Sequence, residues 1–291
     1  MPRSHLRRSM TSYAKTDYPL PRWSRAGNCA HIAAAFLVAS VQSISAYGQC
    51  TNPALQPKER ANAATWTKLQ DFAASSALNK KITRVQSLKT LGHGEVNNDF
   101  YSITIDALSA DFGRDSAMFV RDTPETLATY IRKHLNEVIF GEGSYHVAPY
   151  DQTEDEQWRQ GEIGSLMTFT LASIPNVMPI ERGSVVLSCA DATTWMFSTV
   201  ETSKDGLHPV AGNRAFGVND DGKGGLIIWT KAADRIVNAG IFASLPRSGR
   251  EYIFNQGSAV WTGMLDRLSA RFVDRNPRER VSFSVRRQYV E

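Results

Sequence analysis

Short segments in which apolar and polar side chains alternate constrain the fold of this chain more than any other feature of its sequence. Apolar residues stand at every second position in residues 281–287, and again in residues 100–108. A period of two is that of a strand with one buried face and one solvated face. Turn residues at 205–206 and 219–225 separate the later segments and suit short connections between neighbouring strands. The pattern predicts an antiparallel meander.

Helices are predicted before and after these strands, so the expected class is α+β. The three expected helices cover residues 57–79, residues 124–140 and residues 258–272. The second has the clearest signals, because Thr123 can cap it, Pro124 suits its first position and Gly141 follows it. The expected strands are residues 82–88, 100–108, 166–171, 184–189, 194–200, 214–218, 226–230 and 281–287.

Residues 1–48 have the features of a signal segment. Arg22 and Arg25 precede an uncharged run whose apolar centre, residues 32–41, is too short to span about 30 Å of hydrocarbon. Ala46 and Gly48 place small residues at the −3 and −1 positions of a signal-peptidase site. We expect cleavage after Gly48 and a periplasmic or extracellular mature protein. A membrane anchor formed by uncleaved residues 30–46 is the alternative, and the true start, Met1 or Met10, stays open.

Cleavage would leave residues 49–291, which we expect to form a single α+β domain. Acidic residues gather in residues 152–162, which we expect to be a solvated loop. A subdivision of the domain near residues 150–162 stays open. No segment of the mature chain has the length and hydrophobicity of a membrane span.

The positive charge of the chain lies almost entirely in the signal segment. The net charge is +4 and the sequence pI is about 9.0. Six of the 33 basic residues but only one of the 29 acidic residues lie within the first 48, which leaves 27 basic against 28 acidic residues. The mature chain therefore lacks the basic excess typical of nucleic-acid-binding proteins, and no nucleic-acid partner is expected.

Two cysteines, Cys50 and Cys189, would remain after cleavage, because Cys29 would be removed. An exported protein with two cysteines favours one disulfide between them. The alternative is that Cys189 is a small buried residue in a strand. The cysteines and histidines show no spacing typical of a zinc site, and we expect no metal and no cofactor.

Ionisable and aromatic side chains concentrate in residues 195–235, between glycine-containing turns. One hypothesis is a hydrolytic or transfer site with His208 as general base, Asp234 orienting it, and Arg214 holding developing negative charge. Further candidate ligand-binding residues are Arg235, Asp205, Trp195, Trp229 and Phe216. No Gly-x-Ser-x-Gly elbow occurs, so water would have to be the nucleophile.

Two other interpretations of the same segment are open. In the structural one, Arg214 pairs with Asp234 or Glu201 across the sheet, and His208 bonds a carbonyl. In the binding one, aromatic side chains on a sheet face line a site for a small molecule or a protein partner.

The residues from His208 to Gly217, His-Pro-Val-Ala-Gly-Asn-Arg-Ala-Phe-Gly, and from Trp229 to Arg235, Trp-Thr-Lys-Ala-Ala-Asp-Arg, resemble blocks of a family of uncharacterised bacterial proteins. Some members of that family occur beside or within large Rhs-like secreted proteins. The resemblance covers roughly residues 95–240 and implies no activity. This chain departs from the family pattern at Ala211, where Ser is usual, and at Lys231-Ala232, where Arg-Gly is usual.

Together these features predict an exported, soluble protein with a non-catalytic binding or scaffolding role. The alternative is a small hydrolase or effector-type domain that uses His208, Arg214 and Asp234. The identity of a small-molecule or protein partner is not encoded in any motif of the chain.

Overall fold

A nine-stranded antiparallel sheet forms the centre of the fold in the computed structural model, which describes residues 63–107, 123–140, 146–170 and 182–290. The strand order is β3-β4-β5-β6-β7-β8-β2-β9, and β1 pairs with β6. The strands are β1 Ile82–Val85, β2 Gly92–Asp106, β3 His146–Pro149, β4 Leu166–Thr170, β5 Arg182–Ala190, β6 Thr194–Thr202, β7 Val210–Asp220, β8 Gly225–Val237 and β9 Arg278–Arg287. Strands β3 to β8 are consecutive neighbours, which confirms the expected antiparallel, sheet-rich architecture.

Four α-helices are described: α1 Ala63–Asp71, α2 Pro124–Lys133, α3 Gln152–Gln160 and α4 Arg247–Arg271. Thr123 caps α2 as predicted, and a π-helix, Asn136–Phe140, follows that helix. The long α4 begins eleven residues before the predicted start at Ser258. Its first half contains Gly249 and few apolar residues, so the helical period of its buried face was visible only in the second half.

The prediction of a solvated loop at residues 152–162 was wrong, because this segment contains α3. The Asp151 side chain accepts hydrogen bonds from the backbone N–H groups of Thr153 and Glu154, and Gly161 ends the helix in a left-handed conformation. These are ordinary helix-capping signals. The helix buries only Glu154 and Trp158, so it shows little apolar periodicity.

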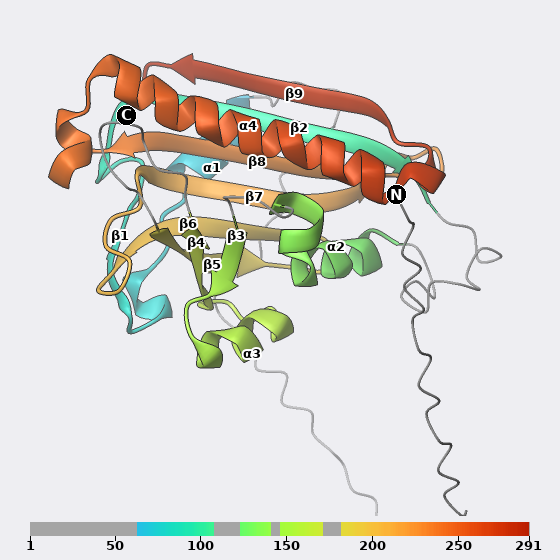
Figure 1. Ribbon diagram of the computed structural model, residues 1–291, viewed down its shortest axis with the longest axis horizontal. Coiled ribbons are helices and arrows are strands. Elements are labelled where there is room, and N and C mark those ends of the chain that lie inside the picture. Colours follow the sequence, from blue (N-terminus) through green and yellow to red (C-terminus); the bar gives the residue numbers. More distant parts are fainter. Residues whose placement is uncertain (1–62, 108–122, 141–145, 171–181, 291) are drawn as a thin grey trace, which may run out of the picture. The chain divides into compact units, whose positions relative to one another are not determined.

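The two faces of the sheet are covered by different helices (Figure 1). On one face, Tyr101, Ile103 and Ile105 of β2 belong to a cluster with α2 and α4. On the other face, Val96 and Phe100 of β2 pack with α1. This separation follows from the alternation of side chains along a strand.

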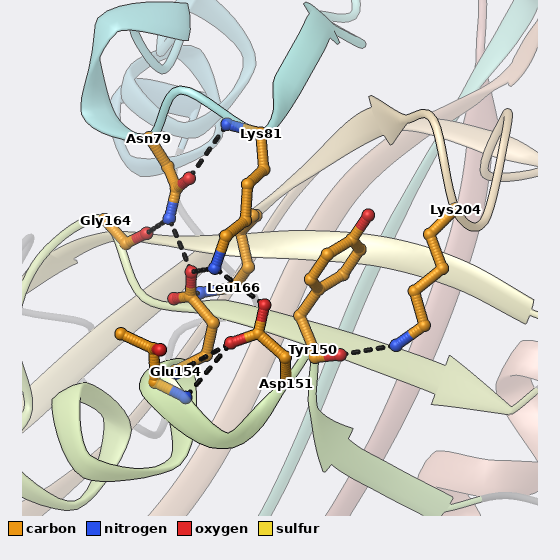
Figure 2. A network of polar contacts seen from close by, with 9 residues as sticks. Asn79, Lys81, Tyr150, Asp151, Glu154, Gly164, Leu166 and Lys204 are labelled. Atoms are coloured by element: carbon orange, nitrogen blue, oxygen red, sulfur yellow. Dashed lines mark hydrogen bonds and ion pairs between the residues drawn. The ribbon is translucent and has the colours of Figure 1, made fainter.

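A buried carboxylate joins α3 to the sheet (Figure 2). Glu154 is 1% exposed, and its Oε1 accepts hydrogen bonds from Asn79 Nδ2 at 2.9 Å and Lys81 Nζ at 2.7 Å. Its Oε2 accepts from the backbone N–H of Leu166 at 2.8 Å, at the start of β4. Lys81 also pairs with Asp151 at 2.8 Å. The full set of partners explains how a charged residue is accommodated in the interior.

None of the helices in the described ranges is long and apolar enough to cross a membrane. Cys189 lies in β5 and is 4% exposed, in the cluster that packs against α1. Residues 1–48 and Cys50 lie outside the described residues. The signal segment and the pairing of Cys50 with Cys189 therefore stay predictions.

Replacing Glu154 with Ala should lower the free energy of unfolding by about 3 kcal/mol, because Lys81 and the Leu166 N–H lose their buried acceptor. Glu156→Ala on the exposed side of the same helix is the matched control and should change it by less than about 0.5 kcal/mol. Urea unfolding of the two variants measures the difference. Equal stabilities would contradict a stabilising role for the buried network.

Thiol titration of the exported protein tests the disulfide. A mature chain with Cys50 paired to Cys189 should show no reactive thiol when it is unfolded without reductant, and two after reduction. Reactive thiols in the unreduced, unfolded chain would contradict the pairing. The loop between these cysteines exceeds 100 residues, so a Cys50→Ser, Cys189→Ser variant should lose about 4 kcal/mol of stability.

Candidate functional site

A cavity of about 170 Å³ lies between the N-terminal half of α4 and the sheet. Its walls are mainly apolar and aromatic. Phe169, Phe197 and Phe216 on the sheet and Tyr252 and Trp261 on α4 contribute to them. Such a combination of an apolar concavity with a few convergent polar groups is typical of small-molecule sites.

The acids and the arginine of the cavity come from two adjacent rows of the sheet. In one row, Asp99 of β2 and Arg214 of β7 are both register partners of Ala232 on β8. In the next row, Asn97 and Gly212 are both partners of Asp234. Residues two apart in a strand share a face, so both rows face the cavity.

Arg214 pairs with Asp99 across the row. Its Nη2 lies 2.8 Å from Asp99 Oδ2, and its Nη1 donates to Thr230 Oγ1 at 3.3 Å. The Arg214 Cζ atom lies 3.9 Å from the centroid of the Trp261 ring, which adds a cation–π contact from α4. The Arg214 side chain is 14% exposed. The positive charge of Arg214 is therefore already engaged by a carboxylate, a hydroxyl and an aromatic face.

Asp99 is the most enclosed acid of the site, with a side chain 3% exposed. Asn97 Nδ2 donates to its Oδ2 at 3.2 Å, in addition to Arg214. Its Oδ1 has no hydrogen-bond partner of normal geometry among the described residues. Burial raises the pKa of Asp99, although the positive charge of Arg214 opposes this shift. One acceptor atom of the site thus lacks a strong donor.

Asp234 adds a second carboxyl group to the same cavity and is half-buried. Burial, and then the negative charge of Asp99, raise its pKa to about 7, and Arg214 offsets only part of this effect. At neutral pH its protonated and ionised forms are therefore comparably populated. The site contains two carboxyl groups, and the Arg214 guanidinium pairs directly with only one of them, Asp99.

His208 lines the cavity with its main chain fixed by Gln86. Gln86 Oε1 accepts from the His208 N–H at 2.9 Å, and Gln86 Nε2 donates to the His208 carbonyl at 2.8 Å. The imidazole Nδ1 lies 3.1 Å from the carbonyl oxygen of Val210. Burial lowers the pKa of His208 to about 4, so the ring is neutral at pH 7. Gly183 packs against the ring, because a Cβ there would lie 2.4 Å from His208 Cδ2.

Four of the predicted site residues line this one cavity: His208, Arg214, Asp234 and Phe216. The partner of Arg214 differs from both partners considered in the structural interpretation. Arg214 pairs with Asp99 rather than with Asp234 or Glu201, and Glu201 pairs with Arg84 at 2.8 Å.

Arg235 and Trp229 lie on the opposite face of β8. Arg235 donates to the carbonyls of Leu88 and Gly94, each at 3.0 Å, and stacks over the ring of Tyr289. Trp229 donates to Asn219 Oδ1 at 2.8 Å. Adjacent residues in a strand point to opposite faces, so Asp234 and Arg235 cannot act in the same site.

Asp205 and Trp195 also lie away from the cavity lining. The Asp205 carboxylate accepts hydrogen bonds from the hydroxyls of Thr168 and Ser184, each at 2.7 Å. Trp195 stacks on the far side of Phe216, with ring centroids 5.3 Å apart, within the core. Both residues support the sheet next to the cavity.

A further buried titratable group, Lys231, lies on the α1 side of the sheet. It is fully buried, and its Nζ has no hydrogen-bond partner among the described residues. Burial lowers the pKa of Lys231 to about 7, with a smaller effect from Lys68. Its Nζ lies 5.7 Å from the Trp229 ring centroid. Strand alternation separates Lys231 from the cavity by the thickness of the sheet.

Asp99, Asn97 and Trp261 were not among the predicted site residues. A signal for Asp99 was nevertheless present, because it continues the alternation of Tyr101 and Ile103 toward the N-terminus. An acid in register with core-facing residues is rarely buried without a function or a partner. No sequence pattern indicated which helix would cover it.

The chain matches no family model and no curated protein. Solved structures resemble it only distantly. A conserved protein from Geobacillus kaustophilus is 7% identical, with a TM-score of 0.31, over 62% of this chain and 99% of that one. Norcoclaurine synthase from Thalictrum flavum, in complex with dopamine and hydroxybenzaldehyde, is 15% identical, with a TM-score of 0.32, over 65% of this chain and 97% of that one. Similarities of this size support no conclusion about function.

Replacing Asp234 with Asn should stabilise the protein in a pH-dependent way. Between pH 4 and 7, the folded wild type keeps a proton that the unfolded chain releases, so its stability falls as pH rises. The stability advantage of Asp234→Asn should grow over this range to roughly 4 kcal/mol and level off above pH 7. Urea unfolding from pH 4 to 8 measures it. An advantage independent of pH would contradict the raised pKa. A gain in stability in Asp234→Asn would show that Asp234 lowers the stability of the wild-type fold.

Proposed function

We propose that this chain is a non-catalytic binding domain that takes a small organic ligand into the cavity under α4. The observation that carries the proposal is an apolar, aromatic cavity with a polar cluster at one wall. Cavities of about 150 Å³ in proteins accept a single benzene ring. We therefore expect a ligand of about one ring, with a polar head group directed to Asp99 and Asp234.

The composition of the polar cluster supports binding over a purely structural role. A structural ion pair needs one acid for Arg214, which Asp99 supplies. Asp234 is additional, and burial makes its ionised form unfavourable. Buried polar groups that are incompletely paired lower stability, so their presence is better explained by a ligand.

A hydrolase or effector-type activity is the second candidate. Asp234 favours it, because a carboxyl group with a pKa of about 7 beside a second carboxyl suits general acid–base chemistry at neutral pH. Water would be the nucleophile. Toxicity of residues 49–291 expressed without the signal segment, abolished by Asp234→Asn, would favour this candidate over binding.

We further propose that the domain acts after export to the periplasm or the outside of the cell. The proposal rests on the signal-like residues 1–48. The intact mass of the exported protein tests it, because cleavage after Gly48 gives a chain that begins at Gln49. Retention of residues 30–46 in a membrane fraction would favour the anchored alternative.

Gly257 provides a test of the cavity itself. It lies on the face of α4 that includes Phe254 and Trp261, and a Cβ built on it meets no atom within 4 Å. Gly257→Leu should fill the cavity, whereas Gly257→Ala should leave most of it open. Both variants replace a helical glycine, so Gly257→Ala controls for helix propensity.

Benzyl alcohol is a suitable one-ring probe for these variants. At ten times its dissociation constant it should raise the free energy of unfolding of the wild type and of Gly257→Ala by about 1.4 kcal/mol. Gly257→Leu should show no such increase. Urea unfolding with and without probe measures the effect, and equal responses of Gly257→Ala and Gly257→Leu would place binding elsewhere.

A further inference from the structure

We propose that the cavity selects organic cations, namely one-ring compounds with an ammonium head group that contacts Asp234. This inference rests on the proposed binding function and specifies the charge of the ligand.

Charged groups on three other strands act on Asp234. Asp99 on β2 is negative when ionised, and Arg214 on β7 is positive. Arg286 on β9 also acts on Asp234, but no ion pair joins the two among the described residues: Arg286 bonds to Asn255 at 3.2 Å, and its Cζ lies 5.0 Å from the centroid of the Phe254 ring. Among the other titratable groups near the cavity, Tyr101 is neutral and His208 is held neutral by burial. The site therefore contains two carboxyl groups, and only one of them, Asp99, has a cation directly paired with it.

The hydrogen-bonding groups of the cavity differ in how many partners they have. The guanidinium of Arg214 already donates to Asp99 and Thr230 and stacks on Trp261. Asp99 Oδ1 has no partner of normal geometry among the described residues, but it is enclosed by protein. The carboxyl group of Asp234 is only half-buried and lines the cavity, so it is the acceptor that a ligand with several N–H donors would complement.

Anionic, neutral and cationic head groups would interact differently with these side chains. An anionic head group would face two carboxyl groups and a guanidinium that is already paired. A neutral hydroxyl would satisfy one acceptor without offsetting the charge of Asp234. An ammonium group offers up to three donors together with a positive charge, and charge-assisted hydrogen bonds are the stronger kind. The aromatic walls match a one-ring body.

Binding of a cation should also displace the proton from Asp234. The ammonium favours the ionised carboxylate, so its affinity should be greatest above pH 7 and fall about tenfold per pH unit below it. A neutral ligand of the same size should show no comparable dependence.

Three probes that share one ring and differ in charge test the inference: benzylammonium, benzyl alcohol and benzoate. At pH 8, calorimetric titration should give benzylammonium an affinity about tenfold or more above that of benzyl alcohol. Benzoate should bind more weakly than either. Equal affinities of benzylammonium and benzyl alcohol would overturn the cation preference but leave the binding function. Failure of all three to bind would overturn the binding function as well.

Asp234→Asn should remove the advantage of benzylammonium and leave the affinity for benzyl alcohol within about twofold. Asp266→Asn is the matched control, because it removes the same charge from an exposed position on α4. It should leave all affinities unchanged. A similar loss in both variants would overturn a direct contact with Asp234.

The wild-type protein provides a test that needs no variant. Titration of benzylammonium in two buffers of different ionisation enthalpy should reveal proton release near pH 6.5, whereas benzyl alcohol should release none. Absence of proton release with benzylammonium would overturn the contact with Asp234.

Discussion

The buried pair of Arg214 and Asp99 is the interaction on which the rest of the cavity depends. Removing two charges from water is costly, and the cost is offset only where geometry and additional contacts are good. Here the contacts come from three directions: Asn97 on the same strand as Asp99, Thr230 on β8, and the Trp261 ring on α4. The helix α4 therefore contributes to the environment of the ion pair through Trp261, and the cavity lies next to this contact.

Small residues provide the space for this arrangement. Ala232 stands between Asp99 and Arg214 in the sheet, so the long side chain of Arg214 can reach the Asp99 carboxylate above it. Gly212 opposes Asp234, and a Cβ at Gly212 would lie 2.2 Å from the carbonyl oxygen of Ala233. Close approach of the backbone therefore requires glycine there. Gly257 on α4 leaves open space on the helix side of the cavity, between the aromatic side chains that line it.

Alternation made the strands predictable, and the cap at Thr123 made α2 predictable, because both signals are local. The N-terminal half of α4, the helix α3 and the short strand β3 were not predicted, since their buried faces are small or polar. The site was predictable in part. Arg214 and Asp234 stand out in the sequence, but their relation to Asp99 depends on which strands become neighbours. That pairing joins residues more than 100 positions apart, and no local pattern encodes it.

The position of β2 between β8 and β9 has a consequence for how the protein assembles. Strands β3 to β8 can pair in the order of the sequence, whereas β2 must wait for β8, and β9 must then pair with β2. The acid that neutralises Arg214 is therefore contributed by the last of these central pairings. Before β2 pairs with β8, Asp99 is not beside Arg214. The ion pair therefore forms when β2 joins the sheet, and the cavity is complete only once α4, which follows β8 in the sequence, has packed on the sheet.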